Sequence, residues 1–154
     1  MDFLKKMMGM GTSASADKKE EIKGIFESNV ERGADYTVLA AMHMVTTKNL
    51  LKEVRTYYNY ILGYKGGDDP EIVVISTDSE LSGFEDPVVC KKSECTKAEY
   101  LTETGSFCIT HPSFDEPLPF AVIASTAWGG YVISVSYVDE FTPFMEFFTT
   151  QFAK

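Results

Sequence analysis

The sequence contains few of the residue types that carry covalent or metal chemistry. Its 154 residues include three cysteines, two histidines and one tryptophan. An odd number of cysteines cannot pair fully within one chain, so a disulfide framework is not expected. No stretch approaches the ~18 uncharged apolar residues of a spanning helix, which excludes an integral membrane protein. No secretory signal pattern is present either, and together these absences predict a cytoplasmic protein.

Basic residues are outnumbered, and the deficit is concentrated in the second half of the chain. The sequence has 14 Lys and Arg against 23 Asp and Glu, a net charge of −9. Residues 80–154 hold four basic and eleven acidic residues, a net charge of −7. Phosphate groups repel such an acidic surface, so nucleic acid is not an expected partner.

The length and composition predict one folded domain. Hydrophobic residues make up 44% and aromatic residues 13%, as in an ordinary globular protein. We expect a flexible N-terminal tail at residues 1–16, ending in a small-residue linker, and a single domain at residues 17–154. The tail could make weak contact with a membrane surface through an apolar stripe, although a frayed terminus is the favoured interpretation. The stripe consists of Phe3, Leu4, Met7 and Met8.

A helix is predicted over residues 17–32. Asp17 and Glu20 have the spacing of a capping box, which places the start of the helix there. One helical face is apolar, because hydrophobic residues recur at intervals of three and four. That face comprises Ile22, Ile25, Phe26 and Val30. Gly33 is suited to end the helix in a left-handed conformation.

The middle of the chain allows two interpretations. Residues 36–47 are apolar at successive positions, which fits a buried strand or a short helix. Residues 48–64 have helical spacing of apolar residues, yet 55–64 are rich in Thr, Tyr and Ile, which favour strands. The turn-forming stretch 65–70 follows, so we favour a hairpin with strands at 54–64 and 71–77.

All six prolines lie after Tyr64, which favours short strands joined by loops. Strands are expected at 88–92, 98–101 and 107–110. A hairpin is expected from 120–126 and 131–138, because the second arm alternates apolar residues with serines. Thr142 and Pro143 open a C-terminal helix whose apolar face is made of phenylalanines.

This order of elements predicts an α+β fold: an N-terminal helix, a bent antiparallel sheet or small barrel of about six or seven strands, and a C-terminal amphipathic helix. The stretches Tyr57–Tyr64, Glu71–Ile75 and Tyr131–Phe152 give the chain an order that resembles the pleckstrin-homology-like (PH-like) superfold over residues 36–154. Bacterial members of that group are often small, cytoplasmic and uncharacterised. Many eukaryotic relatives bind phosphoinositides through a basic pocket, which the acidic second half of this chain does not favour.

Zinc is the sharpest candidate for site chemistry. Cys90, Cys95, Cys108 and His111 lie within 22 positions and are the residue types that structural zinc sites use. The first pair is separated by four residues, however, and thiols are among the most frequently buried side chains. We therefore favour three core cysteines and no cofactor, and keep a zinc-stabilised domain as an alternative.

No nucleophile elbow, phosphate-binding loop, dinucleotide fingerprint or metalloprotease motif occurs, which favours a protein without enzymatic activity. The first functional hypothesis is a binding or scaffold module that acts through protein contacts, with a protein partner or a second copy. Trp128 stands between two predicted strands beside two glycines, so we expect it to contact a partner. The alternative is a small ligand carrier or enzyme with an apolar aromatic cavity inside the sheet.

Overall fold

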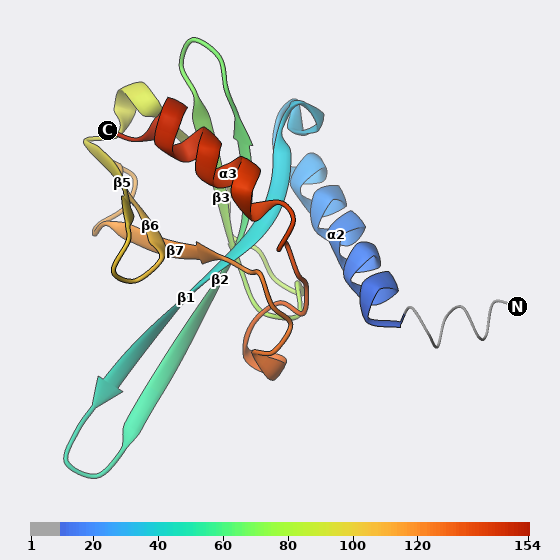
Figure 1. The fold of residues 1–154 in the computed structure, drawn as a ribbon, viewed down its shortest axis with the longest axis vertical. Helices are drawn as coiled ribbons and strands as arrows, with labels where there is room; N and C mark the ends of the chain where they lie inside the picture. The colour runs from blue at the N-terminus through green and yellow to red at the C-terminus, as the bar shows by residue number, and fades with distance from the viewer. Residues whose placement is uncertain (1–9) are drawn as a thin grey trace, which may run out of the picture.

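The computed structural model describes residues 10–154 as a curled antiparallel sheet with a helix against each face (Figure 1). Helix α2 (Met10–Asn29) precedes seven strands, and α3 (Phe141–Phe147) follows them. The strands are β1 (Thr37–Lys48), β2 (Glu53–Lys65), β3 (Glu71–Thr77), β4 (Val88–Lys91), β5 (Lys97–Leu101), β6 (Ser106–Thr110) and β7 (Leu118–Val122). The predicted α+β class is therefore confirmed.

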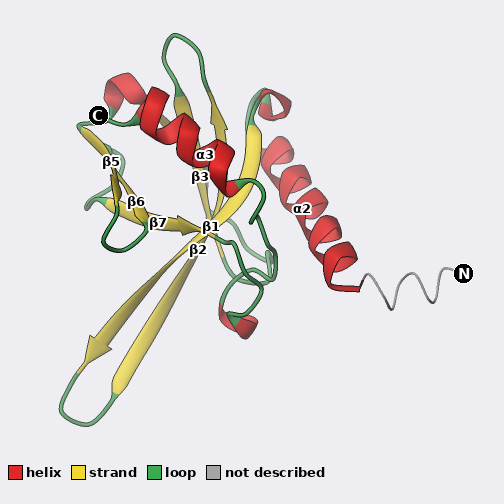
Figure 2. Ribbon diagram, viewed as in Figure 1, coloured by secondary structure: helices red, strands yellow, loops and turns green. Residues whose placement is uncertain are grey.

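The sheet has the strand order β4-β3-β2-β1-β7-β6-β5, and every pairing between its strands is antiparallel. The sheet bends between β1 and β7. Strand β1 pairs with β2 along its whole length but with β7 only at Ala41 and Met42. Because that contact is short, the β5–β7 part of the sheet lies at a steep angle to the β1–β4 part (Figure 2). Within residues 10–154, no helix is long and apolar enough to cross a membrane.

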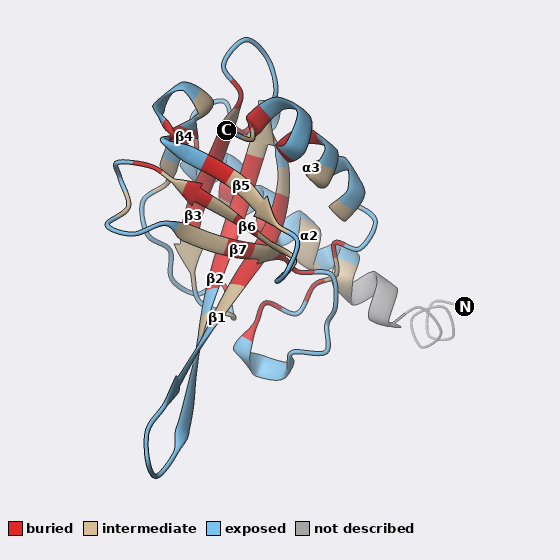
Figure 3. Ribbon diagram, turned by 60° about the vertical axis from the view of Figure 1, so that its left-hand side comes forward, coloured by how far each residue is buried: buried red, intermediate tan, exposed pale blue. Residues whose placement is uncertain are grey.

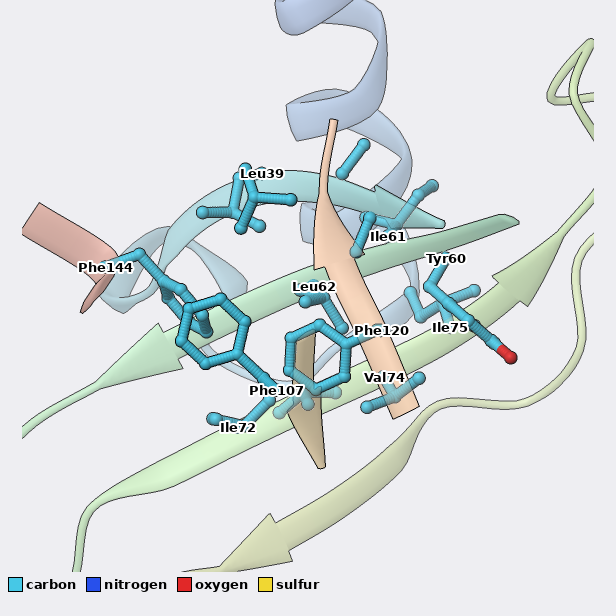
Figure 4. Packing of buried hydrophobic residues seen from close by; sticks show 14 of the residues in the cluster. Leu39, Tyr60, Ile61, Leu62, Ile72, Val74, Ile75, Phe107, Phe120 and Phe144 are labelled. Atoms are coloured by element: carbon cyan, nitrogen blue, oxygen red, sulfur yellow. The ribbon is translucent and has the colours of Figure 1, made fainter. Parts of the chain in front are cut away.

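The inner face of the curled sheet is filled by aromatic rings. Phe107 on β6 is fully buried, and its ring centroid lies 4.9 Å from those of both Phe144 and Phe148. Phe120 on β7 stacks on the same ring at 5.5 Å, and Leu62 and Val74 complete the layer (Figure 4). The helix α3 continues as a π-helical turn, Phe148–Phe152, so its phenylalanine face forms the lid of this core.

The outer face of the sheet is covered by α2, whose predicted apolar face is confirmed. Ile22, Phe26 and Val30 are buried against the strands. The fully buried ring of Phe26 lies against Gly63 on β2, where a Cβ atom would collide with it. A glycine at this position of the strand therefore lets the helix approach the sheet closely.

The boundary predicted for this helix is wrong at its N-terminal end. The helix begins at Met10 rather than at Asp17, so residues 12–16 are helical and not a linker. Alanine favours the helix interior, and the helix packs there: the Ser15 hydroxyl accepts a hydrogen bond of 3.1 Å from the Ser136 N–H. The apolar stripe from Phe3 to Met8 lies outside the described residues.

The middle of the chain forms strands. Of residues 36–47, for which strand and helix remained open, all but Tyr36 belong to β1, and residues 54–64 belong to β2 as favoured. The helical spacing in 48–64 misleads because β2 is buried on both faces at Tyr60, Ile61 and Leu62. A strand that is covered on both faces does not alternate between apolar and polar residues, so its sequence lacks the usual pattern of a strand.

The hairpin expected from 120–126 and 131–138 is wrong in its second arm, which is irregular chain after a short 3-10 turn, Gly129–Tyr131. Its backbone bonds to a side chain instead of a strand. The Asn59 amide donates to the Tyr131 carbonyl at 3.1 Å and accepts from the Ile133 N–H at 2.9 Å. The burial pattern itself is as expected at Ile133, Val135 and Tyr137, which are all buried.

The outer halves of β1 and β2 project from the body as a two-stranded arm, residues 43–58 (Figure 3). Its six residue pairs run from His43–Tyr58 to Lys48–Glu53, which is about 20 Å of strand. Exposed side chains dominate the arm, whereas the inner halves of the same strands are buried. We refer to residues 43–58 as the arm.

Candidate functional site

An open groove of about 710 Å³ lies at the base of the arm. Three segments line it: the residues 57–60 of β2, the end of β3 with the loop that follows it, and the connection between β6 and β7. The first two segments belong to the paired neighbouring strands β2 and β3, and the curl of the sheet brings the connection between β6 and β7 to them. We refer to this site as the groove.

The floor of the groove is apolar and its walls are aromatic. Tyr60 and Val74 are buried beneath it, on the face of the sheet that also carries Leu62. Phe84 is 43% exposed and Tyr58 is 45% exposed at its margins. Large aromatic side chains that remain half in water are the groups most enriched in binding surfaces, because they offer rigid apolar area.

The loop that carries Phe84 is held by its own hydrogen bonds. The Asp78 carboxylate accepts hydrogen bonds from the N–H groups of Glu80 and Ser82 and from the Ser82 hydroxyl, at 2.7 to 3.0 Å. These bonds hold the pKa of Asp78 below its usual value, so this carboxylate stays ionised near neutral pH. The Glu85 N–H bonds to the Ser76 carbonyl at 2.9 Å, which fixes the chain on either side of the phenylalanine.

The groove has a negative rim. Asp78, Glu85 and Asp86 line it, and among the described residues that line it none is basic. Burial raises the pKa of Tyr60 to about 12, with a contribution from the charge of Glu85, so its hydroxyl keeps its proton. The groove therefore combines apolar contact area with negative charge, which suits an apolar side chain that is flanked by cations.

The structure does not bring the four zinc candidates together. Cys90 on β4 and Cys95 are buried near one another, whereas Cys108 lies on β6, opposite Glu99 and Pro119. His111 is buried, its Nδ1 accepts the Ser113 N–H at 3.1 Å, and its Nε2 lies 3.4 Å from a Glu94 oxygen. Within residues 10–154, no group of three or more Cys, His, Asp or Glu side chains is arranged to hold a metal ion.

The three thiols should react slowly in the folded protein. Burial raises the pKa of Cys90 to about 12 and that of Cys95 to about 11, and it also raises the pKa of Cys108. The thiolate is the reactive form, so at pH 8 we expect Cys90 and Cys95 to react about 100-fold slower in native than in denatured protein. A titration with an aromatic disulfide reagent, on the Cys108→Ser variant, measures the two rates.

Metal analysis of the same sample separates burial from metal binding as the cause of slow reaction. Slow thiols without bound zinc are the expected result. Slow thiols that become fast on addition of a chelator, with one zinc per chain, would instead support the zinc-stabilised domain.

Trp128, the predicted partner contact, lies in the loop before the 3-10 turn Gly129–Tyr131 and is 41% exposed. Its side chain is not among those that line the groove. The Trp128 loop is hydrogen-bonded to the loop that follows β3, because the Ser79 hydroxyl donates to the Gly130 carbonyl at 2.7 Å. A contact role for Trp128 therefore stays a prediction.

The groove itself escaped prediction. Phe84 and Phe114 are each a single aromatic residue in a polar loop, so neither stands out in the sequence. The one available signal was the sequence Gly83-Phe84-Glu85-Asp86, in which an aromatic ring directly adjoins two acids.

Comparison of the chain with family models, with curated proteins and with solved structures gives no match. The fold class and the geometry of the groove are therefore the basis for the function proposed below.

Proposed function

We propose that this protein is a binding module of PH-like type that acts through protein contacts, without enzymatic activity, and that the groove is its contact surface. The observation that carries the proposal is that aromatic side chains and three carboxylates line the same groove. The segment that such a groove binds is expected to have apolar side chains next to lysine or arginine.

The placement of the reactive side chains supports a binding role over catalysis. His43, His111 and the three cysteines are absent from the described residues that line the groove. The lining offers carboxylates, hydroxyls and Asn59, and among the described residues none of those hydroxyls is hydrogen-bonded to a carboxylate that could act as its base. Of these, the Asn59 amide is already engaged by the 131–133 segment.

The ligand-carrier alternative expected a cavity inside the sheet. The rings of Phe107, Phe120 and Phe144 occupy that interior. The groove has a volume in the range of small-molecule sites, which keeps a small ligand as the second candidate.

Labelled peptides that share a Leu-Leu core test the proposal. We expect a peptide flanked by lysines to bind at least about tenfold more tightly than one flanked by glutamates, as measured by fluorescence anisotropy. Phe84→Ala removes an aromatic wall and Asp86→Lys reverses a rim charge, so each should weaken binding of the lysine peptide. Val138→Ala is the matched control, because Val138 is exposed and lies outside the groove.

Equal affinity for the two peptides, or binding that survives both groove variants, would refute the groove as a protein-binding site. A thermal-shift panel of metabolites, nucleotides, flavins and lipids tests the second candidate in parallel. Stabilisation by several degrees with one compound class, lost in Phe84→Ala, would favour the ligand carrier.

A further inference from the structure

The tip of the arm presents two leucines to water. Leu50 and Leu51 are 103% and 94% exposed, more than any other large apolar side chains of the described residues. The turn is ordered by Asn49, whose Oδ1 accepts the N–H groups of Leu51 and Lys52, both at 3.0 Å. The Asn49 N–H donates in turn to the Lys52 carbonyl at 3.0 Å. Asparagine thus closes the turn and holds both leucines at its outermost point.

The two faces of the arm differ in charge. Residues paired across β1 and β2 share a face, and the pairs Lys48–Glu53 and Thr46–Arg55 place every charged strand residue on one of them. The other, uncharged face comprises His43, Val45, Thr47, Val54, Thr56 and Tyr58. Water alone gives no reason to confine charges to one face of a projecting hairpin, so the uncharged face has the composition of a contact surface.

The uncharged face leads directly into the groove. Tyr58 belongs to both, and Tyr60 lies two residues further along β2, on the same side of the strand. A segment that lies along the uncharged face therefore continues into the groove without crossing the sheet.

The arm and the groove are complementary in chemistry. Residues 43–58 contain three basic residues and one acidic residue, a net charge of +2 in a chain whose total is −9. Lys48 and Lys52 flank the two leucines, so the tip is an apolar pair between cations. The groove offers aromatic walls between carboxylates. The arm of this chain therefore has the features that we expect of a groove ligand.

We infer that two copies of the chain exchange arms, so that Leu50 and Leu51 of each copy enter the groove of the other. A two-fold axis through the middle of the arm, near the Val45–Thr56 pair, exchanges the tip of one arm with the base of the other. Both grooves are then filled, the two uncharged faces pack on one another, and Lys52 meets the rim at Asp86. This inference rests on the proposed function, because it names the occupant of the same groove.

Sedimentation of the full-length chain over a range of concentrations tests the inference. We expect a monomer–dimer equilibrium, and the double variant Leu50→Ser, Leu51→Ser should raise the dimer Kd at least about 30-fold. Both leucines are exposed in the monomer, so the variant should keep its fold, which thermal unfolding followed by circular dichroism verifies. The control Val138→Ser changes an apolar residue that is 60% exposed and outside both surfaces, and its Kd should stay unchanged.

Charge exchange tests the direction of docking. Lys52→Glu should weaken the dimer about fivefold, and adding Asp86→Lys to the same chain should restore it, since both ends of the pair are then reversed. Mixing the double leucine variant with Phe84→Ala leaves one intact arm facing one intact groove. That mixture should form heterodimers more tightly than either variant forms homodimers.

A chain that is monomeric at every concentration, or a dimer that ignores the leucine variant, would overturn the inference. A monomer whose arm binds anionic lipid vesicles would overturn it too, and would assign the leucines to a membrane surface. If the chain is monomeric while the lysine-flanked peptide still binds, the arm exchange is wrong and the proposed function stands.

Discussion

Replacing Phe107 by alanine should lower the free energy of unfolding by about 4 kcal/mol, a large share of the stability of a domain of this size. The ring is fully buried on β6 and touches aromatic rings from both helical turns at the C-terminus and from two strands. Its removal opens a cavity where the rings of β5, β7 and the C-terminal helix meet, and rigid neighbours such as Phe120 and Phe144 cannot collapse to fill it. Urea unfolding followed by circular dichroism measures the change.

The control for this change is Phe84→Ala, which removes the same ring from a residue that is 43% exposed. Its cost should be about 1 to 2 kcal/mol, because a ring that is already half exposed loses only part of the burial that Phe107 loses. A Phe107→Ala variant whose stability falls by no more than that of Phe84→Ala would mean that the ring layer does not hold the two halves of the sheet together.

The sequence allowed prediction of this core better than of its boundaries. The phenylalanine face of the C-terminal helix and the face made by Ile22, Phe26 and Val30 were both correctly predicted from periodicity. Helical periodicity is readable because each of these helices keeps one face in water. The start of α2 was misplaced because a capping box is a local signal, and packing against Ser136 extends the helix beyond it.

The 131–138 segment shows a different kind of limit. Burial of Ile133, Val135 and Tyr137 was correctly predicted, whereas Tyr131 is exposed. The chain forms no ladder there, because the buried Asn59 amide satisfies the Tyr131 carbonyl and the Ile133 N–H. The residue that replaces a strand partner lies more than 70 positions away, at a separation of 74 from Ile133. The local sequence pattern of residues 131–138 gives no information about a hydrogen-bond partner so distant in the chain.

The candidate site was unpredictable for the same reason. The groove is assembled from the paired strands β2 and β3, the loop after β3, and the β6–β7 connection that the curl of the sheet brings beside them. The charged and uncharged faces of the arm likewise depend on the register of β1 and β2. The Thr46–Arg55 pairing decides which face carries charge, and the sequence alone does not give that pairing. The strands at 54–64 and 71–77 that border the groove were predicted, while the position of the β6–β7 connection beside them was not.

Replacing Gly63 by alanine should lower the free energy of unfolding by about 3 kcal/mol, although it adds only one methyl group. The added Cβ would collide with the ring of Phe26, and that ring is fully buried between α2 and the sheet, so it has no space into which to move. Either the helix shifts away from β2 or the side chain leaves its preferred rotamer, and both lose packing. Chemical denaturation of the purified variant measures the cost.

The same substitution at Gly24 should have the opposite sign. Gly24 lies on α2 with no atom near the position of an added Cβ, so Gly24→Ala should stabilise the helix by about 0.5 to 1 kcal/mol. The collision can be tested further in a Phe26→Ala background, where the ring is gone and the cost of Gly63→Ala should largely disappear. If that cost persists without the ring, or if the two glycine substitutions shift stability in the same direction, the close approach of helix and strand is not what requires glycine at position 63.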